Sequence, residues 1–160
     1  MIGVLFVCLG NICRSPLAEG IFKRKVEEAG LTEFIAVDSA GTSHWHVDEP
    51  PDRRSSEIAR QNGITLNHYG RQISRADLDK FNYILAMDID NYDDIERLQE
   101  SYGNGKAEIL LMRDFDNQQS GADIPDPYYG GANGFQLVFD LLQESLSNFL
   151  EKIIKDHRLK

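Results

Sequence analysis

The residues best suited to chemistry lie near the N-terminus, in the stretch CLGNICRSP at positions 8–16. Cys8 ends an apolar run, and Arg14 and Ser15 follow six and seven positions later. A short loop between a buried strand and a helix points backbone N–H groups and the positive end of the helix dipole into one concavity, which attracts an anion. This field also stabilises a thiolate, and the guanidinium fork of Arg14 can hold two oxygens of a tetrahedral oxyanion. The stretch therefore predicts a nucleophilic sulfur that takes up a phosphoryl group.

The loop itself supplies the rest of the predicted anion site. Gly10 and Asn11 are residue types that tolerate the positive φ angles of such a loop. Ser15 is expected to cap the following helix and to hydrogen-bond the sulfur, with Pro16 in the first turn. The sequence contains neither the Gly-Lys-Ser/Thr loop of nucleotide hydrolases nor a Gly-x-Gly-x-x-Gly stretch. The predicted phosphate-binding residues are Leu9, Gly10, Asn11, Ile12, Cys13, Arg14 and Ser15.

A plainer interpretation of these residues makes Cys8 a small buried hydrophobe and Arg14 a surface residue. For an isolated cysteine that interpretation is favoured. Here the Cys-x5-Arg-Ser pattern falls at a strand–loop–helix junction, which favours the chemical one.

An alternation of strands and helices must position the loop. Residues 3–7 (GVLFV) form a continuous apolar run, which is typical of a strand buried on both faces of a parallel sheet. Further strands are predicted at 34–41, 82–88 and 107–112, and helices at 16–29, 52–63, 89–103 and from about Phe135 onward. The pattern predicts one α/β domain over 1–160, a doubly wound, four-stranded parallel sheet with helices on both faces. Such folds bind ligands at the carboxyl ends of their strands, where the first loop lies.

Composition excludes several classes of protein. Lys and Arg number 17 against 26 Asp and Glu, a net charge of −9, which argues against binding to nucleic acid or to an anionic membrane. No stretch reaches the roughly 18 apolar residues of a membrane span, and the N-terminal run lacks the features of a signal peptide, so we expect a cytoplasmic protein. Two cysteines are too few for a disulfide framework or a cysteine zinc site, and His44 and His46 have no partner at metal-ligand spacing. We expect no metal and no other cofactor.

Five segments, in order, resemble the low-molecular-weight protein tyrosine phosphatases. They are VLFVCLGNICRSP (4–16), VDSAGTS (37–43), NHYGRQIS (67–74), YILAMD (83–88) and IPDPYYGG (124–131). The resemblance covers nearly the whole chain. It implies an enzyme that hydrolyses phosphotyrosine in phosphoproteins through a phosphocysteine at Cys8, without a metal. It also implies inhibition by phosphate-like oxyanions.

A phenol leaving group needs a proton donor, and Asp126 is the candidate. It lies in the long loop 113–134 and precedes Pro127, which stiffens the chain. A carboxyl group beside a thiolate in a partly dry pocket tends to keep its proton, which suits a general acid. A lone Asp-Pro more often marks a turn. The family resemblance reverses that preference and makes Cys8, Arg14 and Asp126 the predicted catalytic residues.

The same resemblance suggests a slot for a phenyl ring and a supporting network. Its predicted walls are Ile12, Trp45, Tyr128 and Tyr129, although Trp45 fits a core or surface plug equally well. Asn11, Ser15, Ser39 and His68 resemble a network that holds the loop, and Asp88 is interpreted as structural. Because Cys13 lies in the same curled loop as Cys8, we expect a reversible disulfide between them under oxidation.

Three alternatives stay open at this level. An arsenate reductase needs further cysteines, which this chain lacks. The phosphoarginine phosphatases that can be compared carry threonine where this chain has Ile12, and they lack the pair of tyrosines. A binding module without catalysis is expected to have lost Cys8, Arg14 or Asp126, and all three are present.

Overall fold

The computed structural model describes residues 1–103, 105–117, 120–127 and 132–159. Its strands are β1 (Ile2–Cys8), β2 (Ile35–Gly41), β3 (Tyr83–Ala86) and β4 (Glu108–Leu111). Its helices are α1 (Arg14–Glu28), α2 (Arg53–Gln61), α3 (Arg75–Lys80), α4 (Ile89–Tyr102) and α5 (Ala132–His157), with a 3-10 helix, η1 (Met112–Phe115). The strands form one sheet in the order β2-β1-β3-β4, and every neighbouring pair is parallel.

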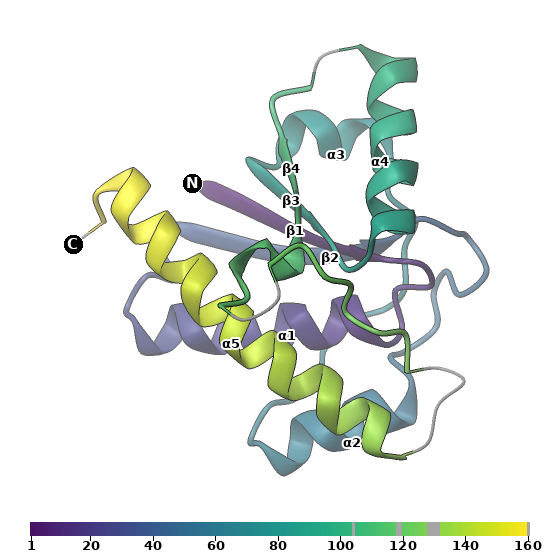
Figure 1. The fold of residues 1–160 in the computed structure, drawn as a ribbon, viewed down its shortest axis with the longest axis vertical. Helices are drawn as coiled ribbons and strands as arrows, with labels where there is room; N and C mark the ends of the chain where they lie inside the picture. Colours follow the sequence, from purple (N-terminus) through teal and green to yellow (C-terminus); the bar gives the residue numbers. More distant parts are fainter. Residues whose placement is uncertain (104, 118–119, 128–131, 160) are drawn as a thin grey trace.

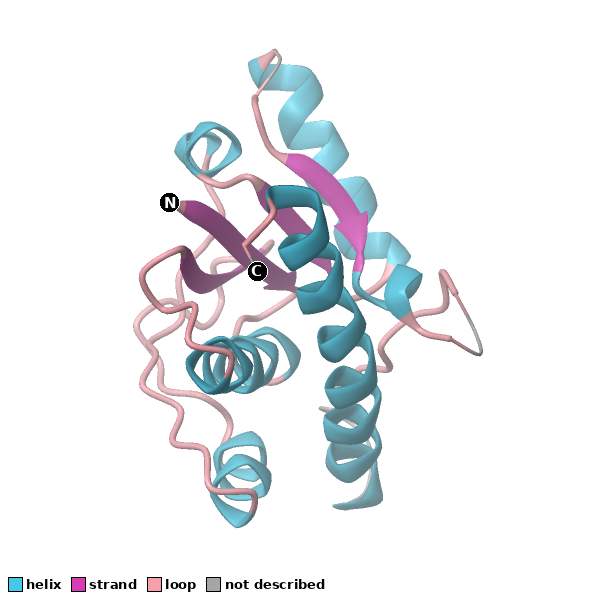
Figure 2. Ribbon diagram, turned by 90° about the vertical axis from the view of Figure 1, so that its left-hand side faces the viewer, coloured by secondary structure: helices cyan, strands magenta, loops and turns pink. Residues whose placement is uncertain are grey.

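Helices cover both faces of this sheet, as the sequence predicts. Figures 1 and 2 show α1 and α5 together on one side, with α2 beyond them, and α3 and α4 on the other. Two separate apolar clusters fill the space between the sheet and its two helical layers. The predicted doubly wound α/β architecture is confirmed.

The central strand β1 contributes to both clusters through its alternating side chains. Val4 and Phe6 point into the cluster with α1 and α5, whereas Leu5 and Val7 point into the cluster with α3 and α4. All four side chains are fully buried. This explains why the strand is apolar without interruption, since neither of its faces meets water.

Three features differ from the sequence-based expectation. The short helix α3 was not predicted, because its six residues have no apolar period; a capping box between Ser74 and Asp77 starts it instead. The 113–134 stretch, expected to be a loop, includes the end of η1 and the first residues of α5. Ser15 is not the N-cap of α1: the helix begins at Arg14, and Cys13 occupies the cap without a side-chain hydrogen bond. The Ser15 hydroxyl has other partners, described below.

Helix α5 carries the largest apolar stripe onto the sheet. Its buried members include Leu142, Leu146 and Phe149, while Leu137 on the same helix is half exposed. No helix within the described ranges is long and apolar enough to cross a membrane.

We predict that Leu146→Ala lowers the free energy of unfolding by about 2–5 kcal/mol, because it leaves a cavity in the core. Leu137→Ala removes the same atoms from a half-exposed site of the same helix and should change stability by less than about 0.5 kcal/mol. Urea unfolding of both variants checks this. Equal losses would contradict the packing of α5.

Candidate active site

Two of the predicted catalytic residues, Cys8 and Arg14, lie with Asp88 at one edge of the sheet, where the strand order reverses. Cys8 is the last residue of β1, and Arg14 is the first of α1. Asp88 follows β3 and caps α4, with its side chain accepting from the Asn91 N–H. β2, the next strand in the chain, pairs with one side of β1, and β3 pairs with the other side. In sheets of this kind the ligand crevice lies outside the carboxyl ends of the two strands at which the order reverses, here β1 and β3.

The loop after β1 curls around the Cys8 sulfur. Asn11 adopts a left-handed conformation with a φ of 59°, and its N–H donates to Cys8 Sγ at 3.3 Å. The hydroxyl of Ser15 lies 3.0 Å from the same sulfur. Gly10 does not have the expected positive φ. Its missing side chain matters for space, because a Cβ there would lie 3.0 Å from His46 Cδ2.

Several backbone donors of the loop are left for a ligand. The N–H groups of Gly10, Ile12 and Cys13 donate to no acceptor among the residues that the structure describes. They lie at the N-terminal end of α1, where the helix dipole adds positive potential. Their place in the loop is compatible with the predicted anion cradle, which stays a prediction here.

Arg14 is buried at the far end of the loop, with only 3% of its side chain exposed. Its Nη1 donates to Asp88 Oδ2 at 2.6 Å and to the Ile124 carbonyl oxygen at 3.0 Å. Its Nη2 lies 3.6 Å from Asp126 Oδ2. Burial opposes the charge of Arg14, but the Cys8 sulfur and Asp88 raise its pKa. The guanidinium is therefore charged and held in one orientation, and Asp88, interpreted as structural, is one of the groups that hold it.

A pocket opens above the sulfur. The residues that line it are Cys8, Leu9, Gly10, Ile12, Cys13, Arg14, Trp45, His46 and Asp126. The Trp45 side chain is 67% exposed, so it stands at the rim and is not a core plug. Tyr128 and Tyr129, the other predicted walls, lie outside the described residues. His46 also lines this pocket, a position that no pattern in the sequence predicts.

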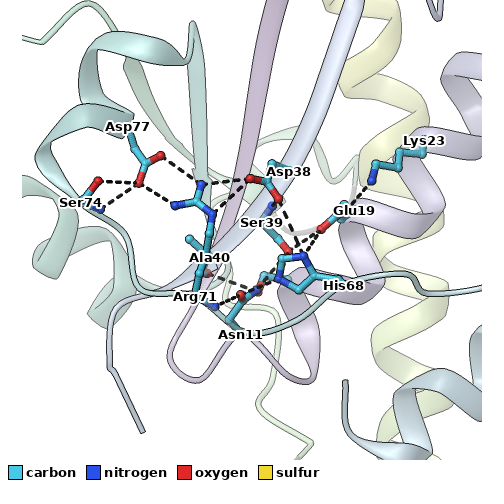
Figure 3. Close-up of polar contacts among 11 residues, drawn as sticks. Asn11, Glu19, Lys23, Asp38, Ser39, Ala40, His68, Arg71, Ser74 and Asp77 are labelled. Carbon is cyan, nitrogen blue, oxygen red and sulfur yellow. Dashed lines mark hydrogen bonds and ion pairs between the residues drawn. The ribbon is translucent and has the colours of Figure 1, made fainter. Parts of the chain in front are cut away.

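Asn11 is also the centre of the predicted supporting network. Its amide nitrogen donates to Ser15 Oγ at 2.8 Å and to Ser39 Oγ at 3.0 Å. Its amide oxygen lies 2.7 Å from His68 Nε2 and accepts from the Arg71 N–H at 3.0 Å. The structure thus brings together all four residues expected in this network, and Figure 3 shows Asn11 between Ser39, His68 and Arg71.

A second layer of charged residues surrounds His68. Its Nδ1 lies 3.2 Å from Glu19 Oε1 and 3.8 Å from Asp38 Oδ1. Burial lowers the pKa of His68, whereas Glu19 and Asp38 favour its charged form. These three side chains are close enough together to hold a metal ion. Each carboxylate is already paired with a cation, however, Glu19 with Lys23 and Asp38 with Arg71. We interpret the group as an ion-pair network.

Cys13 differs from Cys8 in its surroundings. Both cysteines are free and buried. Burial, reinforced by Asp52, raises the pKa of Cys13 to about 12. Cys13 is therefore a protonated thiol at neutral pH, which makes it a weak nucleophile.

Comparison with known proteins identifies the protein family. The family model for low molecular weight phosphotyrosine protein phosphatases matches residues 3–159. The chain belongs to this family. It is 42% identical to the low molecular weight phosphotyrosine protein phosphatase of Schizosaccharomyces pombe over 153 residues, which cover 95% of this chain and 97% of that one. The human phosphatase of the same name is 42% identical over 149 residues, covering 93% and 94% of the two chains.

Solved structures of the family superpose closely on this chain. The protein tyrosine phosphatase from Entamoeba histolytica has a TM-score of 0.90 at 38% identity, covering 98% of this chain and 99% of that one. The Drosophila arginine phosphatase has a TM-score of 0.89 at 37% identity, with coverage of 93% and 96%. Relatives named for two different phosphoryl substrates thus share one backbone, so the substrate class must depend on side chains in the pocket.

In this phosphatase the end of β2 touches the loop directly. A Cβ at Gly41 would lie 2.8 Å from the Leu9 carbonyl oxygen, closer than side chains approach backbone atoms. We therefore predict that Gly41→Ala displaces the loop and weakens binding of inorganic phosphate by about tenfold, on the scale of overpacking costs.

Isothermal titration with phosphate measures this effect. Gly134→Ala is the control, because a Cβ there would meet its nearest atom at 3.5 Å, an ordinary contact. Unchanged phosphate affinity in the Gly41 variant would show that the loop does not form the anion site.

Proposed function

We propose that this phosphatase hydrolyses phosphotyrosine in proteins through a phosphocysteine at Cys8, with Asp126 as general acid and then general base, and without a metal. The observation that carries the proposal is the meeting of three groups in one pocket: the Cys8 sulfur, the Arg14 guanidinium and the Asp126 carboxyl group. Unpaired N–H groups of the loop lie beside them. These are the nucleophile, the oxyanion donors and the proton donor that phosphoryl transfer requires.

In the first step the Cys8 thiolate attacks phosphorus and the bond from phosphorus to the phenol oxygen breaks. The loop N–H groups and Arg14 bind the three equatorial oxygens, whose negative charge they stabilise. Asp126 gives its proton to the departing oxygen. Its side chain is 38% exposed and reaches the pocket from the solvent side of Arg14, where a leaving group would emerge.

In the second step water attacks the phosphocysteine, and the Asp126 carboxylate takes its proton. The bond between phosphorus and sulfur breaks and the thiolate leaves. The Asn11 N–H at 3.3 Å and the Ser15 hydroxyl at 3.0 Å then stabilise the sulfur as a leaving group. A relative supports such an intermediate: the YwlE arginine phosphatase was solved as a cysteine-to-serine mutant with a phosphorylated active-site serine.

The main alternative substrate is phosphoarginine. The Drosophila arginine phosphatase and the YwlE enzyme are similar to this chain at 37% and 26% identity. Against this alternative, Ile12 presents a branched apolar side chain to the pocket, and Trp45 adds an aromatic rim. An apolar wall favours a flat phenyl ring over a guanidinium. The proposed role of Tyr128 and Tyr129 in the same wall remains a prediction.

Oxidative regulation is a further part of the proposal. Peroxide oxidises the Cys8 thiolate to a sulfenic acid; condensation with the Cys13 thiol then forms a disulfide and releases water, and a dithiol reverses it. The raised pKa of Cys13 slows the condensation, because its thiolate is scarce at neutral pH. The cytoplasmic location, in which such a disulfide would be reduced again, remains a prediction.

The role of Asp126 leads to a prediction that depends on the leaving group. Tyrosine is a poor leaving group without a proton, whereas p-nitrophenolate leaves easily. Asp126→Asn should therefore lose about 10²-fold or more in kcat on a phosphotyrosine peptide, and much less on p-nitrophenyl phosphate. Steady-state kinetics without added metal, with chelator present, measures both.

Cys8→Ser is the control, because loss of the nucleophile should abolish turnover of both substrates while phosphate still binds to the loop. If Asp126→Asn lost the same factor in kcat on both substrates, Asp126 would not be the general acid. Normal turnover in Cys8→Ser would overturn the mechanism.

Ile12 yields a second prediction, on substrate choice. The wild-type kcat/KM for phosphotyrosine peptides should exceed that for phosphoserine and phosphoarginine peptides by at least about tenfold, since one apolar pocket contact is worth about that factor. Ile12→Thr should narrow the ratio of phosphotyrosine to phosphoarginine, and the conservative Ile12→Val should keep it. A wild-type preference for phosphoarginine would refute the proposed substrate.

A further inference from the structure

Asn11 depends on one neighbouring segment for its conformation. The two hydrogen bonds to its amide oxygen come from residues 68–71, one from the His68 ring and one from the Arg71 N–H. This segment has no helix or strand of its own. A left-handed non-glycine residue is strained, and it persists only where its surroundings enforce it. Contacts that keep residues 68–71 in place therefore also stabilise the left-handed conformation of Asn11.

The Arg71 side chain is the anchor of that segment. Its Nη1 and Nη2 each donate to one carboxylate oxygen of Asp77 at 3.0 Å, a bidentate pair, and its Nε donates to Asp38 Oδ2 at 3.2 Å. The Asp77 side chain is only 6% exposed, and it also accepts from the Ser74 N–H at the start of α3. Figure 3 shows the guanidinium of Arg71 between Asp77 and Asp38. One arginine thus ties the segment to α3 on one side and to β2 on the other.

The main chain of Arg71 continues this connection to the loop. Its carbonyl oxygen accepts from the Gly41 N–H at 2.8 Å, while its own N–H donates to Asn11. Asp38, which Arg71 binds, also lies 3.8 Å from the His68 ring. Asp38 therefore interacts with both residues that donate to the Asn11 amide oxygen, through the Arg71 side chain and the His68 ring.

We propose that Arg71 is a positioning residue for the phosphate-binding loop. By holding residues 68–71 against Asn11, it keeps the Asn11 N–H on the Cys8 sulfur. The inference rests on the proposed function of Cys8, and it concerns a residue that touches neither substrate nor sulfur.

The chemistry of the arginine side chain is what this role requires. Burial opposes the charge of Arg71, but Asp77 and Asp38 raise its pKa, so it remains a cation. A planar fork can bind Asp77 with two parallel bonds and still reach Asp38, whereas a lysine ammonium acts as a point charge. The activity should therefore fall in the order arginine, lysine, glutamine at this position.

The first test compares Arg71→Gln and Arg71→Lys with wild type. Arg71→Gln should lower kcat on a phosphotyrosine peptide by about tenfold, a size typical of residues coupled in one hydrogen-bond network. Arg71→Lys should retain part of the activity. Arg75→Gln is the matched control, since Arg75 is exposed at the start of α3 and should leave kcat unchanged. Wild-type kcat in Arg71→Gln would overturn the proposal.

A loss of kcat alone also follows from partial unfolding, so Cys8 itself must be probed. Alkylation by iodoacetamide, followed by peptide mapping, reports each cysteine separately. Arg71→Gln should lower the rate of Cys8 alkylation at neutral pH by about tenfold, because the Asn11 N–H no longer stabilises the reacting sulfur. The charged groups of the pocket, Arg14, His46 and Asp126, are the same in both proteins. Alkylation of Cys13 at the same rate as Cys8 would indicate unfolding and count against a positioning role.

A double-mutant cycle then tests the route through Asn11. Arg71→Gln should cost about tenfold in the wild-type background and less than about twofold in Asn11→Ala, where there is no amide left to position. Equal losses in the two backgrounds would refute the route. If Arg71→Gln fails to fold, Asp77→Asn removes the bidentate partner and takes its place in the cycle.

These outcomes separate the two proposals. If wild type does not hydrolyse phosphotyrosine peptides, the proposed function fails, while the alkylation rates still decide whether Arg71 positions Asn11. If wild type is active and the Arg71 variants match it in both assays, only the positioning role fails.

Discussion

The loop after β1, for which we propose phosphate binding, places a buried arginine and a helix N-terminus together, and much of the surrounding structure balances their positive charge. Unpaired N–H groups, the N-terminal end of α1 and the Arg14 guanidinium lie around the pocket that Cys8 lines. A buried arginine needs acceptors, which it finds in Asp88 and the Ile124 carbonyl oxygen. These acceptors come from the end of β3 and from the 120–127 segment, so the site exists only when both have packed against β1.

The opposite side of the loop has a different requirement. The curl that turns the N–H groups inward passes through Asn11 with a φ of 59°. An asparagine is suited to this position because its amide can be bonded on both ends, by Ser15 and Ser39 on one and by His68 and Arg71 on the other. Asp38 and Asp77 neutralise the Arg71 guanidinium of that network, and Glu19 lies 3.2 Å from the His68 ring. The loop is thus held from β2, α1 and the segment before α3 at once.

The family comparison shows how little of this framework bears on substrate choice. A tyrosine phosphatase and an arginine phosphatase superpose on this chain with TM-scores of 0.90 and 0.89. The backbone alone therefore does not distinguish the two substrate classes. Under the proposed function the discrimination between a phenol and a guanidinium comes from the pocket wall, where Ile12 and Trp45 lie.

The amino-acid sequence by itself determined the α/β class, the four strands and the position of the loop. These features are readable from the sequence because each depends on residues close together in the chain: the apolar patterns of strands and helices, and the Cys-x5-Arg-Ser spacing of the loop. Helix α3 was missed because a capping box, not an apolar face, starts it. Ser15 was expected both to cap the helix and to hydrogen-bond the sulfur; the structure contradicts the first role and contains the second contact. The bond that the Ser15 hydroxyl accepts from the Asn11 amide depends on the curled loop. The contacts of Arg14 with Asp88 and of Arg71 with Asp77 and Asp38 were decided by the tertiary structure. They join residues from different elements, and no local pattern records which carboxylate a buried cation will meet.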